Sequence, residues 1–589
     1  MLDGKPGRAE PVRVFAVLML LLVSCVAPGE EPARRAPSLP WFEEVGSRAG
    51  LDFTHISGHD GKQYLLPESA AGGGALFDMD NDGDLDIYLV QSFNSGNEDP
   101  TRTGNRLFEN VGPNQASSEE WSFVDVTAKT GAGDPGYGMG VATGDYDNDG
   151  DLDLYVTNVG SNVLLRNDRD EDGQVVFTDV SVEARVADPS FGSSAAFVDY
   201  DLDGDLDLFV VNYVVWSPAL ERECRNRIGE RDYCDPMEYD APAPDVLLHN
   251  EGPGPDGVVR FRDVSVEAGV RTRHGNGLGV SVADFNGDQL PDIFVANDRM
   301  ADHLWINQGQ QQSGVGFLEQ ASIFGCAIDD DGVAKAGMGT EAVDVDNDGD
   351  PDLLVGNFKD ESDSFYRNEG AYFVDSTPGY GLKTVSRPFT RFGLGLVDFN
   401  NDGLLDLFQA TGRVSRQERW FGNDPYAEPN LLFTGISDEA GKLGFREVVP
   451  RGGTELELFS AARAAAFGDI DNDGRVDILV VNRDQRAHLL HNVTKESGRW
   501  VSFRALNQHG SDAIGAVVSF EVQGQRIWRS VRTAHSYLAA SDPRVHSGLA
   551  ANDQLANVTV LWPNGVVEKF GDFEAGRVWQ LKQGAGNLD

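Results

Sequence analysis

The stretch DMDNDGDLDIYLV at residues 78–90 decides the fold, because its first nine residues recur along the chain. Close copies lie at Asp145–Asp153, Asp199–Asp207, Asp344–Asp352, Asp398–Asp406 and Asp469–Asp477, and a looser copy lies at Asp284–Asp292. The 589-residue chain therefore holds seven copies. Apolar and β-branched residues follow each copy, as they do in a buried strand. Such internal repetition predicts a repeat architecture.

Two further strand patterns accompany the loops. An apolar strand precedes each loop, and these strands are marked by Phe42, Phe123, Phe177, Phe261, Phe317, Phe373 and Phe445. Another apolar strand follows each loop, usually ending in Asn: Leu107–Asn110, Leu164–Asn167, Leu247–Asn250, Leu304–Asn307, Phe365–Asn368, Leu431–Thr434 and Leu489–Asn492. With the strands that enter and leave the loop, each unit offers about four short strands.

A small sheet of this kind cannot bury both of its faces alone, and radial stacking of such sheets solves the problem. We therefore predict an all-β fold, with a seven-bladed β-propeller over residues 41–494. The units average about 65 residues, which is longer than compact propeller repeats. The excess lies in loops such as Ser217–Pro244. A linear β-solenoid is the structural alternative, and the long, irregularly spaced units disfavour it.

The loop pattern predicts calcium. Ca²⁺ takes six to eight oxygen ligands in a tolerant geometry. Carboxylates at positions 1, 3, 5 and 9 of a curled loop converge, position 7 contributes its backbone carbonyl, and Gly at position 6 permits the turn. Only Gln289 departs from that Gly, and we expect Gly287 to relocate the turn. About seven calcium sites follow.

The predicted ligands occupy positions 1, 3, 5, 7 and 9 of the seven loops. They are Asp78, Asp80, Asp82, Asp84 and Asp86; Asp145, Asp147, Asp149, Asp151 and Asp153; Asp199, Asp201, Asp203, Asp205 and Asp207; Asp284, Asn286, Asp288, Leu290 and Asp292; Asp344, Asp346, Asp348, Asp350 and Asp352; Asp398, Asn400, Asp402, Leu404 and Asp406; and Asp469, Asp471, Asp473, Arg475 and Asp477.

Two alternatives to these sites are disfavoured. An EF-hand needs a Glu at position 12 and flanking helices. Position 12 is instead Leu89, Val156, Val210, Val295, Val355, Gln409 or Val480. Plain acidic turns would not need oxygen-bearing residues at fixed positions seven times over.

The chain carries a formal net charge of −47. Such a charge argues against electrostatic attachment to nucleic acid or to an anionic membrane. Bound cations account for clustered acidity better than halophily, in which acidic residues would spread over the surface.

The N-terminus predicts export. Basic residues precede the apolar run 14–23, which is too short to span a bilayer but suits a signal peptide. The run ends in Leu22-Val-Ser-Cys25, which is similar to a bacterial lipobox. We expect residues 1–24 to be a signal peptide, Cys25 to be lipidated, and residues 25–40 to be a linker. An ordinary cleaved signal is the alternative.

Three further cysteines lie in the body of the chain. In an oxidising envelope, we expect Cys224 and Cys234 to form a disulfide that braces the loop Ser217–Pro244. A zinc pair is less favoured, because zinc ligands usually lie closer together in sequence. Cys326 is expected to be a buried small hydrophobic residue.

The loops resemble the calcium loops of FG-GAP (VCBS-type) repeats, as in the propellers of integrin α-subunits. The segments 65–68, 72–74 and 231–234 resemble bacterial relatives of cartilage acidic protein. The tail is similar to the ASPIC/UnbV domain, on the segments 510–516, 536–542 and 558–565. This copy has His546-Ser-Gly-Leu-Ala550, where relatives usually have an aromatic residue after the His. The resemblance implies a small antiparallel β-sandwich over residues 495–589.

No catalytic constellation is visible in the sequence. His55, His59 and Glu68 are the best candidates, and structural histidines are the favoured interpretation. Gly-x-Ser-x-Gly, His-Glu-x-x-His and phosphate-loop patterns are absent from the sequence. We therefore expect no enzyme and no cofactor other than Ca²⁺.

The sequence favours a monomeric extracytoplasmic protein, tethered to the membrane only by its lipid. It would bind a protein or glycan at the cell surface, with Ser217–Pro244 as the contact loop. An extracellular hydrolase or lyase on polysaccharide or phosphoester, and a scaffold of an envelope or export complex, are the alternatives.

Overall fold

The computed structural model describes residues 39–92, 104–113, 121–170, 173–311, 314–417, 421, 423–495 and 497–588. The predicted signal peptide, the lipidation at Cys25 and the linker up to residue 38 lie outside these ranges. None of the helices within them is long and apolar enough to cross a membrane.

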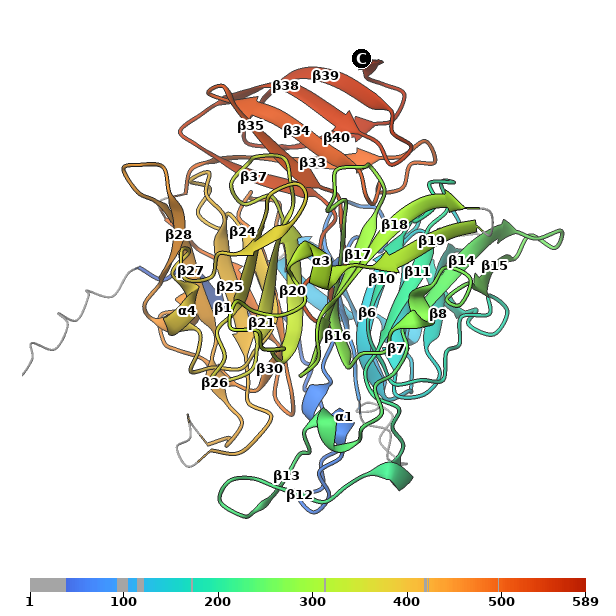
Figure 1. Cartoon of the computed structure of the whole chain (residues 1–589). Coiled ribbons are helices and arrows are strands. Elements are labelled where there is room, and N and C mark those ends of the chain that lie inside the picture. The colour runs from blue at the N-terminus through green and yellow to red at the C-terminus, as the bar shows by residue number, and fades with distance from the viewer. Residues whose placement is uncertain are drawn as a thin grey trace, which may run out of the picture. The chain divides into compact units, whose positions relative to one another are not determined.

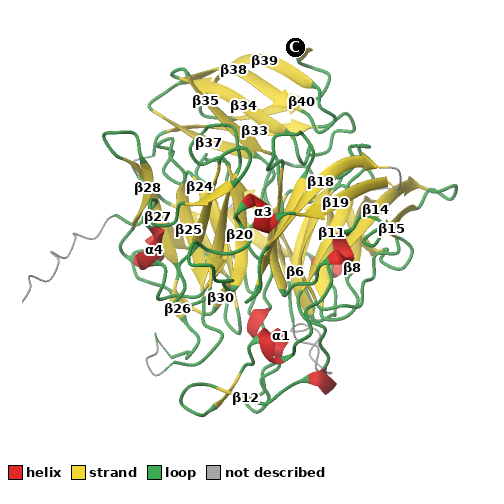
Figure 2. Ribbon diagram, in the orientation of Figure 1, coloured by secondary structure: helices red, strands yellow, loops and turns green. Residues whose placement is uncertain are grey.

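Seven sheets, each built on four antiparallel strands, form most of the fold (Figures 1 and 2). In chain order of their first strands they are β2 (Gly74–Phe77), β3 (Asp86–Leu89), β4 (Arg106–Pro113) and β5 (Trp121–Asp125); β6 (Gly138–Gly144), β7 (Asp153–Asn158), β8 (Val163–Arg169) and β9 (Val175–Asp179); β10 (Gly192–Val198), β11 (Asp207–Asn212), β14 (Val246–Pro253) and β15 (Val259–Asp263); β16 (Gly277–Ala283), β17 (Asp292–Asn297), β18 (His303–Gln311) and β19 (Gly314–Glu319); β20 (Gly337–Val343), β21 (Asp352–Asn357), β22 (Ser364–Asn368) and β23 (Phe373–Asp375); β24 (Arg391–Val397), β25 (Asp406–Thr411), β27 (Leu431–Ser437) and β28 (Leu443–Glu447); and β30 (Ala462–Gly468), β31 (Asp477–Asn482), β32 (His488–Asn492) and β1 (Phe42–Glu44). We number these blades 1 to 7.

The first strands of the blades close a ring. Each contacts the first strand of the next blade, from β2 to β6 and onward to β30, and β30 contacts β2 again. The predicted seven-bladed propeller is therefore confirmed.

The structure groups the strands differently from the sequence units. The Phe-containing strand before each loop joins the blade of the preceding loop, so β5 pairs with β4 and β1 pairs with β32. The N-terminal β1 thus completes the last blade and joins the two ends of the propeller. A hydrophobic pattern identifies strands but does not say which neighbour each one pairs with.

The cores lie between neighbouring blades. Val141 and Leu154 of blade 2, for example, pack in one cluster with Ala75 and Tyr88 of blade 1. The first and second strands of most blades are buried on both faces. Such strands appear in the sequence as continuous apolar runs rather than as alternating ones.

The connections between strands are largely irregular, and the longest lies between β11 and β14. The helical turns are α1 (Leu66–Ala70), α2 (Thr127–Thr130), α3 (Ala321–Phe324) and α4 (Leu382–Val385), with 3₁₀ turns η1 (Pro218–Leu220), η2 (Pro236–Glu238), η3 (Val270–Thr272) and η4 (Arg451–Gly453). Two small two-stranded sheets pair β12 (Cys224–Arg225) with β13 (Arg231–Asp232) and β26 (Glu428–Pro429) with β29 (Phe459–Ser460).

The C-terminal region forms a second β domain, at the top of Figure 1. One sheet holds β37 (Val545–Ala550), β33 (Arg499–Leu506) and β40 (Val578–Lys582); the other holds β35 (Gln525–Ser530), β34 (Val517–Val522), β38 (Gln554–Leu561), β39 (Val567–Glu574) and β41 (Asn587–Leu588). Phe503, Phe520 and Trp562 are buried in its core. The domain is not wholly antiparallel as expected, because β33 and β40 run parallel.

A segment of this second domain enters the centre of the propeller. We call residues 533–541 the axial segment. Within it, β36 (Ala539–Ala540) pairs in parallel with β2, the first strand of blade 1. A side chain at Gly73 would place its Cβ 2.6 Å from the Leu538 carbonyl oxygen, so this close approach requires glycine.

Candidate metal centres

The seven Asp-rich loops connect the first and second strands of their blades with one backbone conformation. Position 6 has positive φ in every loop, from 68° at Gln289 to 103° at Gly349. Position 4 also has positive φ, at Asn in five loops, at Leu202 and at Gly287. Loop 4 therefore keeps the common turn, and the expectation that Gly287 relocates it is wrong. The sequence analysis missed the signal for this conformation, which is the Asn at position 4 of five loops. Asn tolerates the left-handed region of backbone conformation.

Position 1 organises the first half of each loop through backbone hydrogen bonds. In loop 2 the Asp145 carboxylate accepts the N–H groups of Asp149 at 3.2 Å and of Gly150 at 2.8 Å. In loop 4 the Gln289 N–H donates to Asp284 at 2.7 Å, as Gly does elsewhere. These bonds curl the chain around one carboxylate.

Position 9 fixes the second half of each loop, and both of its oxygens accept backbone N–H groups. Asp153 accepts from Tyr146 at 3.1 Å and from Asn167 at 2.8 Å. Asp292 accepts from Phe285 at 3.0 Å and from Asn307 at 2.8 Å. The carboxylate at position 9 therefore has a fixed orientation before any ion binds.

Positions 1, 3 and 9 converge as the sequence predicts. One oxygen from each lies within 4.8 Å of the others in Asp78, Asp80 and Asp86, in Asp145, Asp147 and Asp153, and in Asp199, Asp201 and Asp207.

Burial leaves some of these oxygens without partners. Buried oxygens that accept no hydrogen bond from any described residue are Oδ1 of Asp78, Asp147, Asp201, Asp346 and Asp471. A buried, unpaired carboxylate oxygen is costly, and a hard cation compensates for that cost. The donor set of these loops therefore fits Ca²⁺.

The electrostatics of the loops point the same way. Burial, with the neighbouring carboxylates, raises the pKa of Asp147 and Asp199 to about 7. Burial raises the pKa of Asp352 to about 8, although two backbone N–H groups oppose the shift. Each loop thus gathers carboxylates that cannot all ionise without a cation.

Side chains at positions 4 and 7 link successive loops, a role that sequence reasoning missed. Asn81 donates to Asp151 of the next loop at 2.9 Å, and Asn148 donates to Asp205 at 2.7 Å. Asn472 of loop 7 donates to Asp84 of loop 1 at 2.9 Å. Where position 7 is Asp, its side chain therefore holds the neighbouring loop, while its carbonyl remains the predicted ligand.

The Asn that ends the third strand joins each blade to the one before it. Asn167 Nδ2 donates to Met79 O of loop 1 at 2.9 Å and to Leu152 O of its own loop at 3.1 Å. The same pair of bonds recurs at Asn110, Asn250, Asn307, Asn368 and Asn492. In blade 6 this position is Gly435, whose N–H still reaches Asp406 at 2.8 Å.

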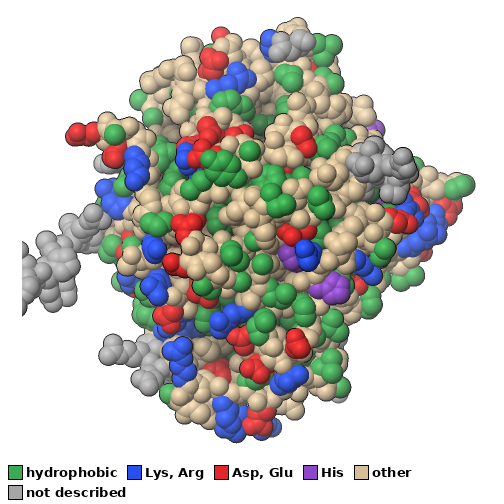
Figure 3. Space-filling view, in the orientation of Figure 1, with side chains coloured by type: hydrophobic (Ala, Val, Ile, Leu, Met, Phe, Trp, Pro, Cys, Tyr) green, Lys and Arg blue, Asp and Glu red, His purple; other side chains and the backbone are tan. Residues whose placement is uncertain are grey.

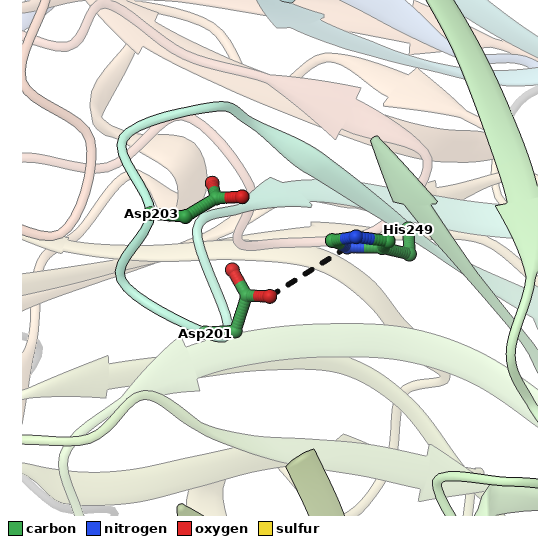
Figure 4. Close-up of side chains that lie close together, drawn as sticks. All are labelled: Asp201, Asp203 and His249. Atoms are coloured by element: carbon green, nitrogen blue, oxygen red, sulfur yellow. Dashed lines mark ion pairs between the residues drawn. The ribbon is translucent and has the colours of Figure 1, made fainter. Parts of the chain in front are cut away.

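Loops 3 and 7 add an imidazole to the carboxylates. In loop 3 His249 projects from β14 toward Asp201, with Nδ1 3.7 Å from its carboxylate, and Asp203 completes the group (Figure 4). In loop 7 His491 groups with Asp471 and Asp477, at positions 3 and 9. These two loops therefore have a mixed nitrogen and oxygen donor set.

The C-terminal domain contacts five of the loops, which sequence reasoning did not foresee. Arg504 pairs with Asp78 of loop 1 at 3.2 Å, and Ser511 donates to Asp145 of loop 2. Arg529 donates to Asn347 of loop 5 at 3.1 Å. His546 and Arg544 make the contacts to loops 6 and 7, to Asn401 at 2.8 Å and Asn472 at 2.6 Å respectively.

The axial segment bonds to the first strands of most blades. Thr340 N donates to Ser536 O at 2.9 Å, and Ser536 N donates to Thr340 O at 2.7 Å. Thr533 donates to Thr143 O at 3.0 Å, and Leu538 N donates to Ser194 Oγ at 3.2 Å. The Tyr537 hydroxyl donates to Ala70 O at 2.8 Å. The segment therefore bridges blades that do not contact one another directly.

The candidate histidines do not form one cluster. His59 Nδ1 lies 2.9 Å from the Glu68 carboxylate. His55 is fully buried, bonds to Ser92 Oγ at 2.8 Å instead, and has its pKa lowered to about 4 by burial. A buried neutral imidazole of this kind serves packing and hydrogen bonding.

The cysteines of the body lie in two environments. The sulfur atoms of Cys224 and Cys234 are 2.04 Å apart, as in a disulfide bond. Cys326 is a free, buried thiol.

Comparison with family models assigns the propeller repeats and the C-terminal domain. The FG-GAP-like repeat model matches residues 78–156, 145–210, 284–355 and 344–408, and the ASPIC and UnbV model matches residues 507–588. The chain carries FG-GAP-like repeats and a C-terminal ASPIC/UnbV domain. The axial segment, residues 533–541, lies within the ASPIC/UnbV match, and loops 1, 2, 5 and 6 beneath that domain lie within the FG-GAP-like matches.

Curated relatives align with this chain over most of their length. Cartilage acidic protein 1 of Mus musculus is 27% identical over 84% of this chain and 70% of its own. The Homo sapiens protein of that name is 26% identical over 92% of this chain and 77% of its own.

Solved structures are more distant. A structure of an Agrocybe aegerita lectin that recognises non-reducing terminal N-acetylglucosamine is 15% identical, covering 71% of this chain and 86% of that one, with a TM-score of 0.36. The structure of a functionally unknown protein of Desulfotomaculum acetoxidans is 11% identical. It covers 66% of this chain and 88% of that one, with a TM-score of 0.31. We draw no argument from either.

Proposed function

We propose that this chain is a calcium-stabilised extracytoplasmic interaction protein that recognises a protein or glycan at the cell surface. The observation that carries the proposal is the division of the propeller into two ends. The ASPIC/UnbV domain covers the end that bears the metal loops, and the disulfide hairpin 224–234 projects from the opposite end (Figure 1). The second end carries the long connection between β11 and β14, and loops on a rigid scaffold commonly carry recognition.

The role of calcium in this proposal is structural. The ions would be held by the carboxylates of the seven loops and by the carbonyl at position 7. They would neutralise groups that burial otherwise protonates, and so would stiffen the loops on which the ASPIC/UnbV domain rests. The proposed role requires no catalytic step, and the separate structural contacts of His55 and His59 support that.

The proposed location is the outer side of a bacterial envelope. The protein would be a monomer, anchored by a lipid on Cys25. The resemblance of residues 22–25 to a lipobox and the Cys224–Cys234 disulfide support it. Labelling cells with an alkyne fatty acid tests the anchor. Wild type should incorporate the label and Cys25→Ala should not; equal labelling of both would contradict the anchor.

Recognition is tested by measuring binding to an array of surface glycans and to purified envelope proteins. The wild-type chain is compared with a variant in which residues 224–234 are replaced by Gly-Gly. Both are assayed in calcium, with circular dichroism as a check on folding. We expect binding that the hairpin variant loses at least tenfold. A ligand bound equally by both variants would reject the assigned face, and no ligand on any array would reject the recognition role.

A further inference from the structure

A cavity of about 610 Å³ lies on the propeller axis, at the end opposite the ASPIC/UnbV domain. Ligand cavities for small molecules typically measure about 300–1,000 Å³. The cavity lies where first strands begin and second strands end, and Leu278, Met338 and Phe392 line its inner part.

The axial segment packs against two residues that line the cavity. The Tyr537 ring lies 5.0 Å from the Phe392 ring, and its hydroxyl bonds to Ala70 O at 2.8 Å. Both Phe392 and Ala70 line the cavity. The cavity therefore has an apolar inner part, and loop residues of 225–236 and 413–417 line it toward the exposed end.

The mouth of the cavity is basic, although the chain as a whole is strongly acidic. Six cationic side chains line the cavity, against the three carboxylates Asp235, Asp298 and Asp360: Arg225, Arg227, Arg299, Lys359, Arg413 and Arg416. On the face shown in Figure 3, Lys and Arg side chains are likewise prominent at the lower end of the molecule. This local excess is notable against a net charge of −47.

Most of these cations are held in place by acids, and one is not. Arg299 pairs with Asp235 at 2.9 Å and lies over the Phe358 ring at 5.9 Å. Lys359 pairs with Asp360 at 2.9 Å. Arg227 is exposed and forms no ion pair or hydrogen bond with any described residue.

The wall of the cavity also holds an unsatisfied polar atom. Tyr233 is 8% exposed, and its hydroxyl is buried without a hydrogen-bond partner among the described residues. Tyr233 belongs to the disulfide hairpin, one residue before Cys234. A buried hydroxyl with no protein partner is suited to bonding a bound molecule.

We propose that this cavity binds a small organic anion with an apolar body, such as an aromatic or aliphatic carboxylate or sulfonate. The apolar body would lie against Leu278, Met338 and Phe392. The anionic group would lie at the mouth, near Arg227, and the Tyr233 hydroxyl would bond a polar atom of the ligand. This site shares the hairpin 224–234 with the proposed surface recognition, but it needs only the cavity and not a macromolecular partner.

Two fluorescent probes of nearly the same shape test the proposal on the full, calcium-loaded chain. 8-Anilinonaphthalene-1-sulfonate carries two aromatic groups and a sulfonate, and N-phenyl-1-naphthylamine lacks the sulfonate. We expect one sulfonate probe per chain, bound at least tenfold more tightly than the neutral probe. Equal affinities, or no binding of the sulfonate probe at millimolar concentration, would overturn the proposal.

Variants then locate the binding. Arg227→Glu should weaken the sulfonate probe about tenfold and leave the neutral probe unchanged. Val414→Trp, on a loop at the cavity mouth, should weaken both probes by filling the space. Arg185→Glu, an exposed charge reversal outside the cavity, is the matched control and should change neither. Unfolding midpoints confirm that the variants fold, and sulfonate binding unaffected by both cavity variants would place the probe elsewhere and overturn the assignment.

Discussion

The axial segment offers the sharpest test of how the two domains hold together, and Tyr537 is its central residue. The side chain is fully buried, its ring contacts Phe392, and its hydroxyl donates to Ala70 O at 2.8 Å. Tyr537→Phe keeps the ring and leaves one buried carbonyl unpaired, which should cost about 1–2 kcal/mol. Tyr537→Ala also removes the ring from a closed site, and comparable aromatic truncations cost about 3–5 kcal/mol.

Urea-induced unfolding followed by tryptophan fluorescence measures these losses. The C-terminal domain and the propeller both contain tryptophan, so separation of one transition into two would also be visible. We expect Tyr537→Ala to separate the transitions and to expose residues near the axial segment to protease. Tyr372→Ala, at a tyrosine that is 51% exposed, is the control and should cost less than about 0.5 kcal/mol.

The reasoning fails if Tyr537→Ala unfolds at the wild-type urea concentration as a single transition. That result would mean that the axial segment contributes nothing to the union of the domains. A loss as large in Tyr537→Phe as in Tyr537→Ala would show that the hydrogen bond, and not the ring, carries the contact.

Two further predictions concern the blades. Asn307→Ala removes Nδ2 bonds to Tyr200 O at 2.8 Å and Pro291 O at 3.3 Å, and should destabilise the propeller by about 2–4 kcal/mol in urea unfolding; a loss no larger than that of exposed Gln174→Ala would contradict the joining role of this Asn. Burial raises the pKa of Asp245 from 3.8 to about 7, so its contribution to stability is fully present below the unfolded pKa and is lost as pH rises through the folded pKa. That loss is about 4 kcal/mol at most. Asp245→Asn should abolish it, because Asn does not titrate. The Asn side chain should fit, since Asn162 of blade 2 accepts the equivalent backbone N–H at 2.8 Å. Urea midpoints measured from about pH 3.5 to pH 9 check this, and parallel pH profiles of wild type and variant would refute it.

The sequence predicts the elements that repeat. The Asp, Gly and Asp pattern of each loop follows from the needs of a curled oxygen-rich turn, so positions 1, 3 and 9 could be placed before the structure was known. The Phe-containing strands could be placed as well, and β1 and β23 begin at Phe42 and Phe373. Local chemistry decides these features. Because the pattern occurs seven times, it remains recognisable where single positions depart from it.

The sequence does not predict what is made by residues far apart. The pairing of β1 with β32 joins residues about 450 positions apart, and no local pattern encodes it. The bonds of Asn167 to Met79 O and of Ser536 to Thr340 O cross between units in the same way. The segment 536–542 was used for the resemblance to ASPIC/UnbV, yet its short, mixed pattern gives no sign that it enters the propeller.

The count of bound calcium ions tests the central claim most directly. Purified chain is dialysed to equilibrium against buffered Ca²⁺, and the metal per chain is measured by mass spectrometry. The account predicts about seven ions per chain, and one fewer when Asp292→Asn removes the position-9 carboxylate of loop 4. A count of three or fewer, or a count that Asp292→Asn leaves unchanged, would contradict it.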